Sequence, residues 1–278
     1  MTAIPMSLAM MVVGGVGLAQ AIAAPEAAGA RWRRHTAVVA LAAAAAAAAL
    51  SATQPGTLSL VEVLGTLLML LLVLGQWLLA YYGQWALQRW LGIQVFLLFT
   101  LPVAGVELAA ITAYPGRHSG IALAAGLAGV AGASLACGLV GGALAACLLA
   151  CPRPRDATDA APPPRALRRL LIMVLVMILL RLILSATMAL WPWWDRWGID
   201  SSAPHAAGPP RNLWTAAMLL GRYAVGVLLP LAVTATAFHA AGRGGRRRAC
   251  VLLGLATAAL VIGEACALEL SRATARPF

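Results

Sequence analysis

The sequence has no lysine, and only 10% of its 278 residues are charged. Soluble domains carry roughly 25% charged residues, while here 62% of the residues are hydrophobic. A chain of this composition would aggregate in water. The composition therefore excludes an ordinary soluble protein and favours an integral membrane protein.

Ligand-forming residues are also scarce, because the chain holds four histidines and five cysteines. The cysteines contain no C-x-x-C pair, and the histidines lie in predicted loops or near predicted helix ends. A haem in a helix bundle needs ligands at matching depth in facing helices. No glycine-rich phosphate loop or H-E-x-x-H pattern is present. We therefore expect no haem and no metal in this chain.

Long apolar runs recur along the whole sequence. A helix that crosses a bilayer about 30 Å thick needs roughly 20 residues. Runs that are apolar on every face, without the alternation of membrane strands, favour helices. We predict an all-α bundle of about eight transmembrane helices at 3–24, 36–52, 58–80, 91–113, 119–150, 167–191, 213–239 and 249–270. The Ala-rich second run leaves a count of seven open.

The chain is predicted to form a single transmembrane domain over residues 1–278. The Pro-rich stretch 151–165 is interpreted as a linker between helices one to five and helices six to eight. Gly138 and Gly142 form a G-x-x-x-G pair, which predicts a close helix approach.

Arginine supplies all 20 basic residues and predicts the orientation. Thirteen of them follow helices one, three, five and seven, whereas few lie at the opposite ends. The positive-inside rule places that group in the cytoplasm and both termini outward. The net charge of +11 is explained by topology and anionic lipid, and needs no nucleic acid.

Five ionisable residues lie inside the predicted spans, where a charge is costly and usually faces the bundle interior. Glu269 is left out because it sits at the outer end of the last predicted helix and can reach water. Their predicted depths all lie between the midplane and the outer surface. They could form a paired structural network or a site for a ligand that exchanges protons. A quinol suits such a site, because a carboxylate of raised pKa can accept a proton on oxidation. The five residues are Glu62, Glu107, Arg181, Arg222 and Glu264.

Two segments of the chain resemble the membrane anchor subunit of DMSO reductase and its relatives among the molybdopterin oxidoreductase complexes. The segment Leu58 to Gly65 is similar to the start of the family's third helix, where a glutamate is implicated in menaquinol binding. Leu260 to Glu264 is similar to the family's closing Gly-Glu pattern. The length, helix number and outward termini also agree with that family.

The resemblance implies a multi-pass subunit of the bacterial inner membrane. It would oxidise menaquinol and pass electrons to an iron-sulfur subunit bound to a molybdopterin catalytic subunit. Glu62 would accept a proton, and Gln54 would lie nearest to the position of the family's quinol-linked histidine, which is missing here. Arg181, Arg222, Glu107 and Glu264 would support the site. The alternatives are a small-solute or ion transporter, and a structural anchor without a working quinol site.

Overall fold

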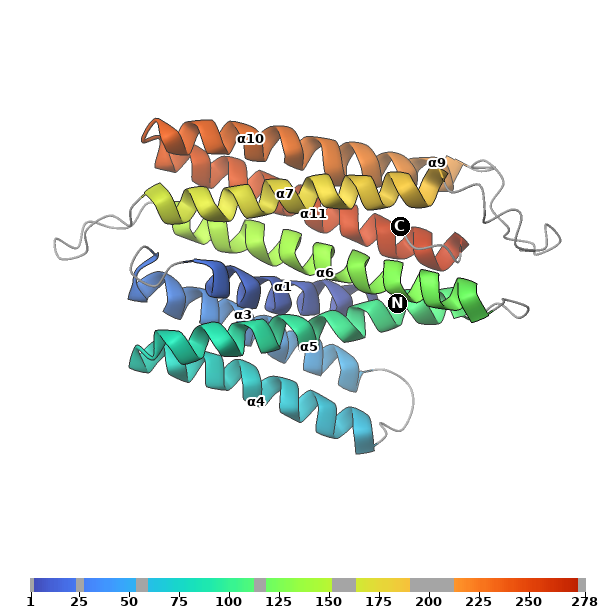
Figure 1. The fold of residues 1–278 in the computed structure, drawn as a ribbon, viewed down its shortest axis with the longest axis horizontal. Helices are drawn as coiled ribbons and strands as arrows, with labels where there is room; N and C mark the ends of the chain where they lie inside the picture. Colours follow the sequence, from blue (N-terminus) through green and yellow to red (C-terminus); the bar gives the residue numbers. More distant parts are fainter. Residues whose placement is uncertain are drawn as a thin grey trace.

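Eight apolar helices run side by side along the length of the molecule in a computed structural model of the chain (Figure 1). The structure describes residues 3–23, 28–53, 60–112, 119–151, 164–190 and 213–274. Over these residues it contains helices and turns and no strand. The predicted all-α transmembrane bundle is thereby confirmed, including the Ala-rich second helix.

The helices follow the predicted order, with one span built from three consecutive segments. They are α1 (Ala3–Ile22), α3 (Ala30–Ala52), α4 (Leu60–Tyr82), α5 (Trp85–Thr112), α6 (Ser119–Ala150), α7 (Pro164–Leu190), α9 (Leu213–Leu220), the π-helix η1 (Gly221–Leu228), α10 (Leu229–Gly242) and α11 (Arg246–Thr274). The N- and C-terminal labels lie toward the same end of the bundle in Figure 1, as an even number of spans requires. We call the end where α1 begins the outer end and the opposite end the cytoplasmic end, following the predicted orientation.

Several helices begin earlier than the sequence predicted. Helix α3 begins at Ala30 and not at 36, and α5 begins at Trp85 and not at 91. Arginines that the prediction placed in loops thus lie in the first turns of helices. A long arginine side chain can reach polar surroundings from such a position, so its charge does not end a helix.

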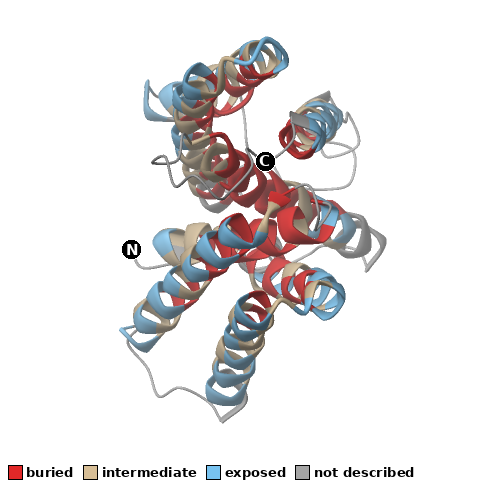
Figure 2. Cartoon of the chain, turned by 90° about the vertical axis from the view of Figure 1, so that its left-hand side faces the viewer, coloured by how far each residue is buried: buried red, intermediate tan, exposed pale blue. Residues whose placement is uncertain are grey.

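Helix α6 is the central helix of the bundle. In an apolar stretch of 18 residues in α6, 72% of the residues are buried, against 17% in the corresponding stretch of α4. It packs against α1, α5, α7 and α11, while α4 packs mainly on α3 and α5. Figure 2 shows buried residues toward the middle of the bundle and exposed residues on the outer faces of the helices. The exposed leucines of α4 are suited to a lipid environment.

The apolar core crosses between the two predicted halves of the chain. One cluster joins Met11 of α1, Val103 of α5 and Val140 of α6 to residues of the second half. Ile178 of α7 and Leu260 of α11 belong to the same cluster. The halves therefore share one core around α6. Most of the predicted linker 151–165 lies outside the described residues.

Glycines permit the closest helix crossings. A Cβ atom at Gly15 of α1 would collide with the α6 backbone at Cys137 and Gly141, so these two helices touch through their backbones. At Gly138 and Gly142, added Cβ atoms would collide with the side-chain ends of Met177 and Met173 of α7, respectively, so these two glycines make room for methionine side chains. Small residues allow this proximity in membrane bundles.

Candidate functional site

Three of the predicted residues meet in one buried cluster, which we call the outer triad: Arg181, Arg222 and Glu264. One Nη atom of Arg181 donates to Oε2 of Glu264 at 3.0 Å, and Nη1 of Arg222 donates to Oε1 at 2.8 Å. Each of the three side chains is at most 2% exposed. One carboxylate therefore bridges two guanidinium groups, which joins α7, η1 and α11.

The three residues lie at similar distances from the outer end of the bundle. Glu264 lies seven residues before the end of its candidate span, Arg181 lies six before the end of its span, and Arg222 lies six after the start of its span. At about 1.5 Å per residue, all three are about 9 to 11 Å from the outer end. The predicted location between midplane and outer surface agrees with these spans.

The π-helix that carries Arg222 has a local cause in the sequence. Pro230 has no N–H group and cannot bond the carbonyl of the residue four positions earlier. The chain widens before it, and the N–H of Leu229 bonds the carbonyl of Ala224, five residues back. π-Helical turns are rare in proteins overall, but those that do occur are often found at functional sites. The structure thus shows a widened stretch of helix directly before Pro230.

A second glycine crossing brings the carboxylate within reach of Arg222. Gly226 of η1 and Gly263 of α11 pack backbone to backbone, and a Cβ atom on either would collide with the other. Gly263 directly precedes Glu264, so the closest contact between the helices lies beside the ion pairs. The Gly-Glu sequence therefore serves both packing and charge pairing.

The outer triad carries a net charge of +1 when all three groups are ionised. Nη1 of Arg222 is paired, but its buried Nε and Nη2 atoms have no hydrogen-bond partner among the described residues. Unpaired buried donors are costly and call for an explanation. They could bind a further acceptor, such as an anion or a carbonyl oxygen.

The side chains of the other predicted residues, Glu62, Glu107 and Gln54, lie outside the part of the chain that the structure describes. Glu62 lies in the first turn of α4, whose main packing partners are α3 and α5. Glu107 lies in α5, near its outer end. Gln54 falls outside the described residues. The bundle therefore separates the helix of Glu62 from those of the triad.

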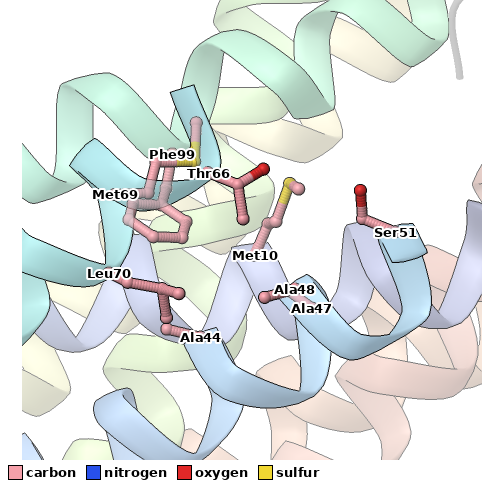
Figure 3. A pocket seen from close by; sticks show the side chains of 9 residues that line it. All are labelled: Met10, Ala44, Ala47, Ala48, Ser51, Thr66, Met69, Leu70 and Phe99. Atoms are coloured by element: carbon pink, nitrogen blue, oxygen red, sulfur yellow. The ribbon is translucent and has the colours of Figure 1, made fainter. Parts of the chain in front are cut away.

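An apolar pocket lies beside α4 in the outer half of the bundle (Figure 3). Its polar lining side chains are Ser51, near the end of α3, and Thr66, six residues after the start of α4. The volume is about 30 Å³. Apolar side chains and small alanines line the rest: Met10, Ala44, Ala47, Ala48, Met69, Leu70 and Phe99.

The structure also contains a buried polar network at the cytoplasmic end, where the sequence indicated only topology. Arg33 is fully buried and donates to Oε1 of Gln88 at 3.2 Å and to the carbonyl of Ala23 at 2.7 Å. Nε2 of Gln88 donates to Oε1 of Gln20 at 2.9 Å, and Nε2 of Gln20 donates to Oγ1 of Thr36 at 2.7 Å. We call these four side chains the cytoplasmic network. The glutamines within apolar runs were the available sequence signal for it.

Three cysteines also meet at the cytoplasmic end, a grouping that the sequence prediction missed. The Sγ atoms of Cys147, Cys151 and Cys250 all lie within 4.8 Å of one another. Two of them are four residues apart on one helix face, while the third comes from α11. Burial, and then the neighbouring Cys250 thiol, raise the pKa of the Cys151 thiol to about 11. The spacing of the cysteines in the sequence does not indicate this cluster, because the third thiol comes from a different helix.

Fold and composition define the chain as a multi-pass helical membrane protein. No family model, no curated protein and no solved structure matches it. Its function must therefore be argued from its own residues.

Proposed function

We propose that the chain is the membrane anchor subunit of a redox complex and binds menaquinol at the pocket between α1, α3, α4 and α5. In this proposal the quinol is oxidised at the outer side of a bacterial inner membrane. Two electrons pass to an iron-sulfur subunit and from there to a molybdopterin subunit. Two protons leave the quinol, and Glu62 accepts the first.

The observation that carries the proposal is the position of the pocket relative to Glu62. Thr66 lines the pocket, and Glu62 precedes it by four residues, which places both positions on one face of α4. Alanine and methionine side chains offer an apolar surface for a quinol ring and its tail. The hydroxyl groups of Ser51 and Thr66 could hydrogen-bond the quinol oxygens. Few polar groups in an apolar wall are typical of small-molecule sites.

The pocket has to widen to admit a ring. A volume of about 30 Å³ holds little more than a water molecule. Met10 and Met69 line it, and methionine side chains adapt readily because they are unbranched and flexible. Entry of a quinol thus requires these side chains to rotate out of the pocket.

The remaining predicted residues take supporting roles in this proposal. Gln54 follows α3 in the sequence, and we assign it a hydrogen bond to a quinone oxygen. The outer triad of Arg181, Arg222 and Glu264 lies on other helices, so we assign it to holding α7, η1 and α11 together. We assign a supporting role in the proposed quinol site to Glu107, which lies on α5.

A second candidate function is transport of a small anion. It is favoured by the π-helix within a candidate span and by the two unpaired N–H donors of the buried Arg222. Transporters often bind their substrates where a membrane helix is interrupted. In that case the outer triad, and not the pocket beside α4, would be the binding site.

Purification of the tagged chain in a mild detergent tests these candidates. Bound proteins would be identified by mass spectrometry, and bound quinone by chromatography of the lipid extract. The anchor proposal predicts an iron-sulfur protein, a molybdopterin protein and menaquinone. An unrelated eight-helix protein purified from the same cells controls for quinone carried over with lipid.

The other outcomes separate the alternatives. Both partner proteins without quinone above the control would indicate a structural anchor with no working quinol site. A chain recovered without redox partners, which then moves an anion across vesicles, would replace the anchor with the transporter.

A further inference from the structure

The three-thiol cluster at the cytoplasmic end has no part in the proposed quinol chemistry. Cys147 lies in the last turn of α6, and the N–H of Cys151 bonds its carbonyl at 2.9 Å, which continues the helical pattern by one residue. The two thiols therefore lie one above the other. Cys250 lies in the second turn of α11. All three residues are only partly buried.

Contacts between α6 and α11 hold the thiols together. The Cys147 thiol donates to the carbonyl oxygen of Cys250 at 3.5 Å. Nη2 of Arg246 donates to the carbonyl of Leu149 at 2.9 Å, which ties the start of α11 to the last turn of α6. The cluster is thus part of a packed helix junction.

We propose that Cys147, Cys151 and Cys250 bind one Cu(I) ion in a three-coordinate thiolate site. Three sulfurs in a plane, each about 2.3 Å from one ion, would be about 4.0 Å apart. The sulfurs already lie within 4.8 Å of one another. Closing the site therefore needs shifts of less than about 1 Å, which side-chain rotation can supply.

The three thiolate ligands determine which metal ion the site prefers. Thiolates are soft ligands that favour Cu(I), Zn(II) and iron-sulfur clusters. Structural zinc sites have four ligands, and among the described residues no histidine, aspartate or glutamate completes this group. Three thiolates without a fourth side chain fit a soft ion that accepts three ligands.

Binding exchanges protons for the metal and changes the local charge. Each of the three S–H bonds is replaced by an S–Cu bond, so three protons leave to water. The copper-thiolate group then carries a charge of −2. Arg246, Arg247 and Arg248 precede Cys250 in the first turn of α11 and can balance it. Placement at the predicted cytoplasmic end also keeps the thiols reduced.

The test is anaerobic titration of the full-length, detergent-purified protein with Cu(I) against a chromophoric Cu(I) chelator. We expect one tightly bound ion per chain, and X-ray absorption with three sulfur neighbours at about 2.3 Å. The triple variant Cys147→Ser, Cys151→Ser and Cys250→Ser should lose at least 100-fold in affinity. The matched control is Cys137→Ser with Cys266→Ser, which leaves the cluster intact and should bind as the unmodified protein does.

Folding is checked separately, by equal helical circular dichroism and equal elution of all variants. If the triple variant does not fold, Cys151→Ser alone replaces it, because this residue lies just beyond α6; it should lose at least tenfold. Unchanged Cu(I) affinity in the cluster variants, loss in the control, or tighter binding of Zn(II) than of Cu(I) would overturn the proposal. None of these results depends on quinone or on redox partners, so the quinol proposal is tested independently.

Discussion

The two ends of this bundle bury arginine in different ways. At the cytoplasmic end, Arg33 is fully buried and bonds the carbonyls of Gln20 and Ala23 and the amide of Gln88. At the outer end, Arg181 and Arg222 share the carboxylate of Glu264. At the cytoplasmic end the buried guanidinium donates to neutral oxygen atoms, whereas at the outer end the two guanidinium groups pair with a carboxylate.

Helix ends explain the difference. The last carbonyls of a helix have no partner within that helix and carry partial negative charge. Arg33 and Arg89 lie beside the end of α1 and use such carbonyls, Ala23 and Ala21, respectively. Deep within a span, the backbone carbonyls are already bonded. A buried arginine at that depth therefore needs a carboxylate, as the outer triad shows.

The largest expected effect comes from removing the shared counter-ion. Glu264→Gln removes the carboxylate charge that two buried guanidinium groups share, and we expect a loss of about 3–5 kcal/mol in the free energy of unfolding. The measurement is denaturant unfolding of the purified protein in mixed micelles. Replacing all three residues with methionine should restore most of the stability, because all three charges of the outer triad are then removed together. Equal losses in the two variants would contradict the account.

A smaller effect is expected at the cytoplasmic end. Arg33→Gln removes the donors to Ala23 and Gln88, and we expect a loss of about 1–3 kcal/mol in the same unfolding measurement. The carbonyls lie at a helix end, where water can replace the lost donors. Arg34→Gln is the matched control, since Arg34 is exposed, donates to the carbonyl of Tyr81 at 3.2 Å and lies over the Tyr81 ring. A loss for Arg33→Gln as large as that for Glu264→Gln would remove the distinction between the two ends.

The sequence predicted the fold well because membrane helices are specified by long apolar runs. Eight spans in an all-helical bundle follow from composition and length alone. The boundaries were wrong mainly where arginines begin a helix, as at α3 and α5. The prediction assigned arginine-containing segments to loops, whereas an arginine near a membrane surface can lie within a helix.

The candidate sites were predictable only in part. Depth along each helix grouped Arg181, Arg222 and Glu264 together with Glu62 and Glu107, and the first three do meet in the structure, as expected of charges that need partners within a span. Depth does not specify which helices are neighbours, so it could not show that α4 packs away from α11. The thiol cluster was missed for the same reason, since Cys250 is about 100 residues from Cys151 in sequence and meets it only through packing.

The most direct test of the quinol site is Glu62→Gln in the assembled complex. The amide keeps the size of the side chain but cannot accept the quinol proton, so quinol oxidation should fall by about 10²–10⁴-fold. Glu269→Gln is the matched control, a second carboxylate near the outer end of a helix, on α11. It should oxidise quinol at the unmodified rate, and both variants should assemble normally. Unchanged quinol oxidation in an intact Glu62→Gln complex would contradict the central claim that this pocket binds and oxidises quinol.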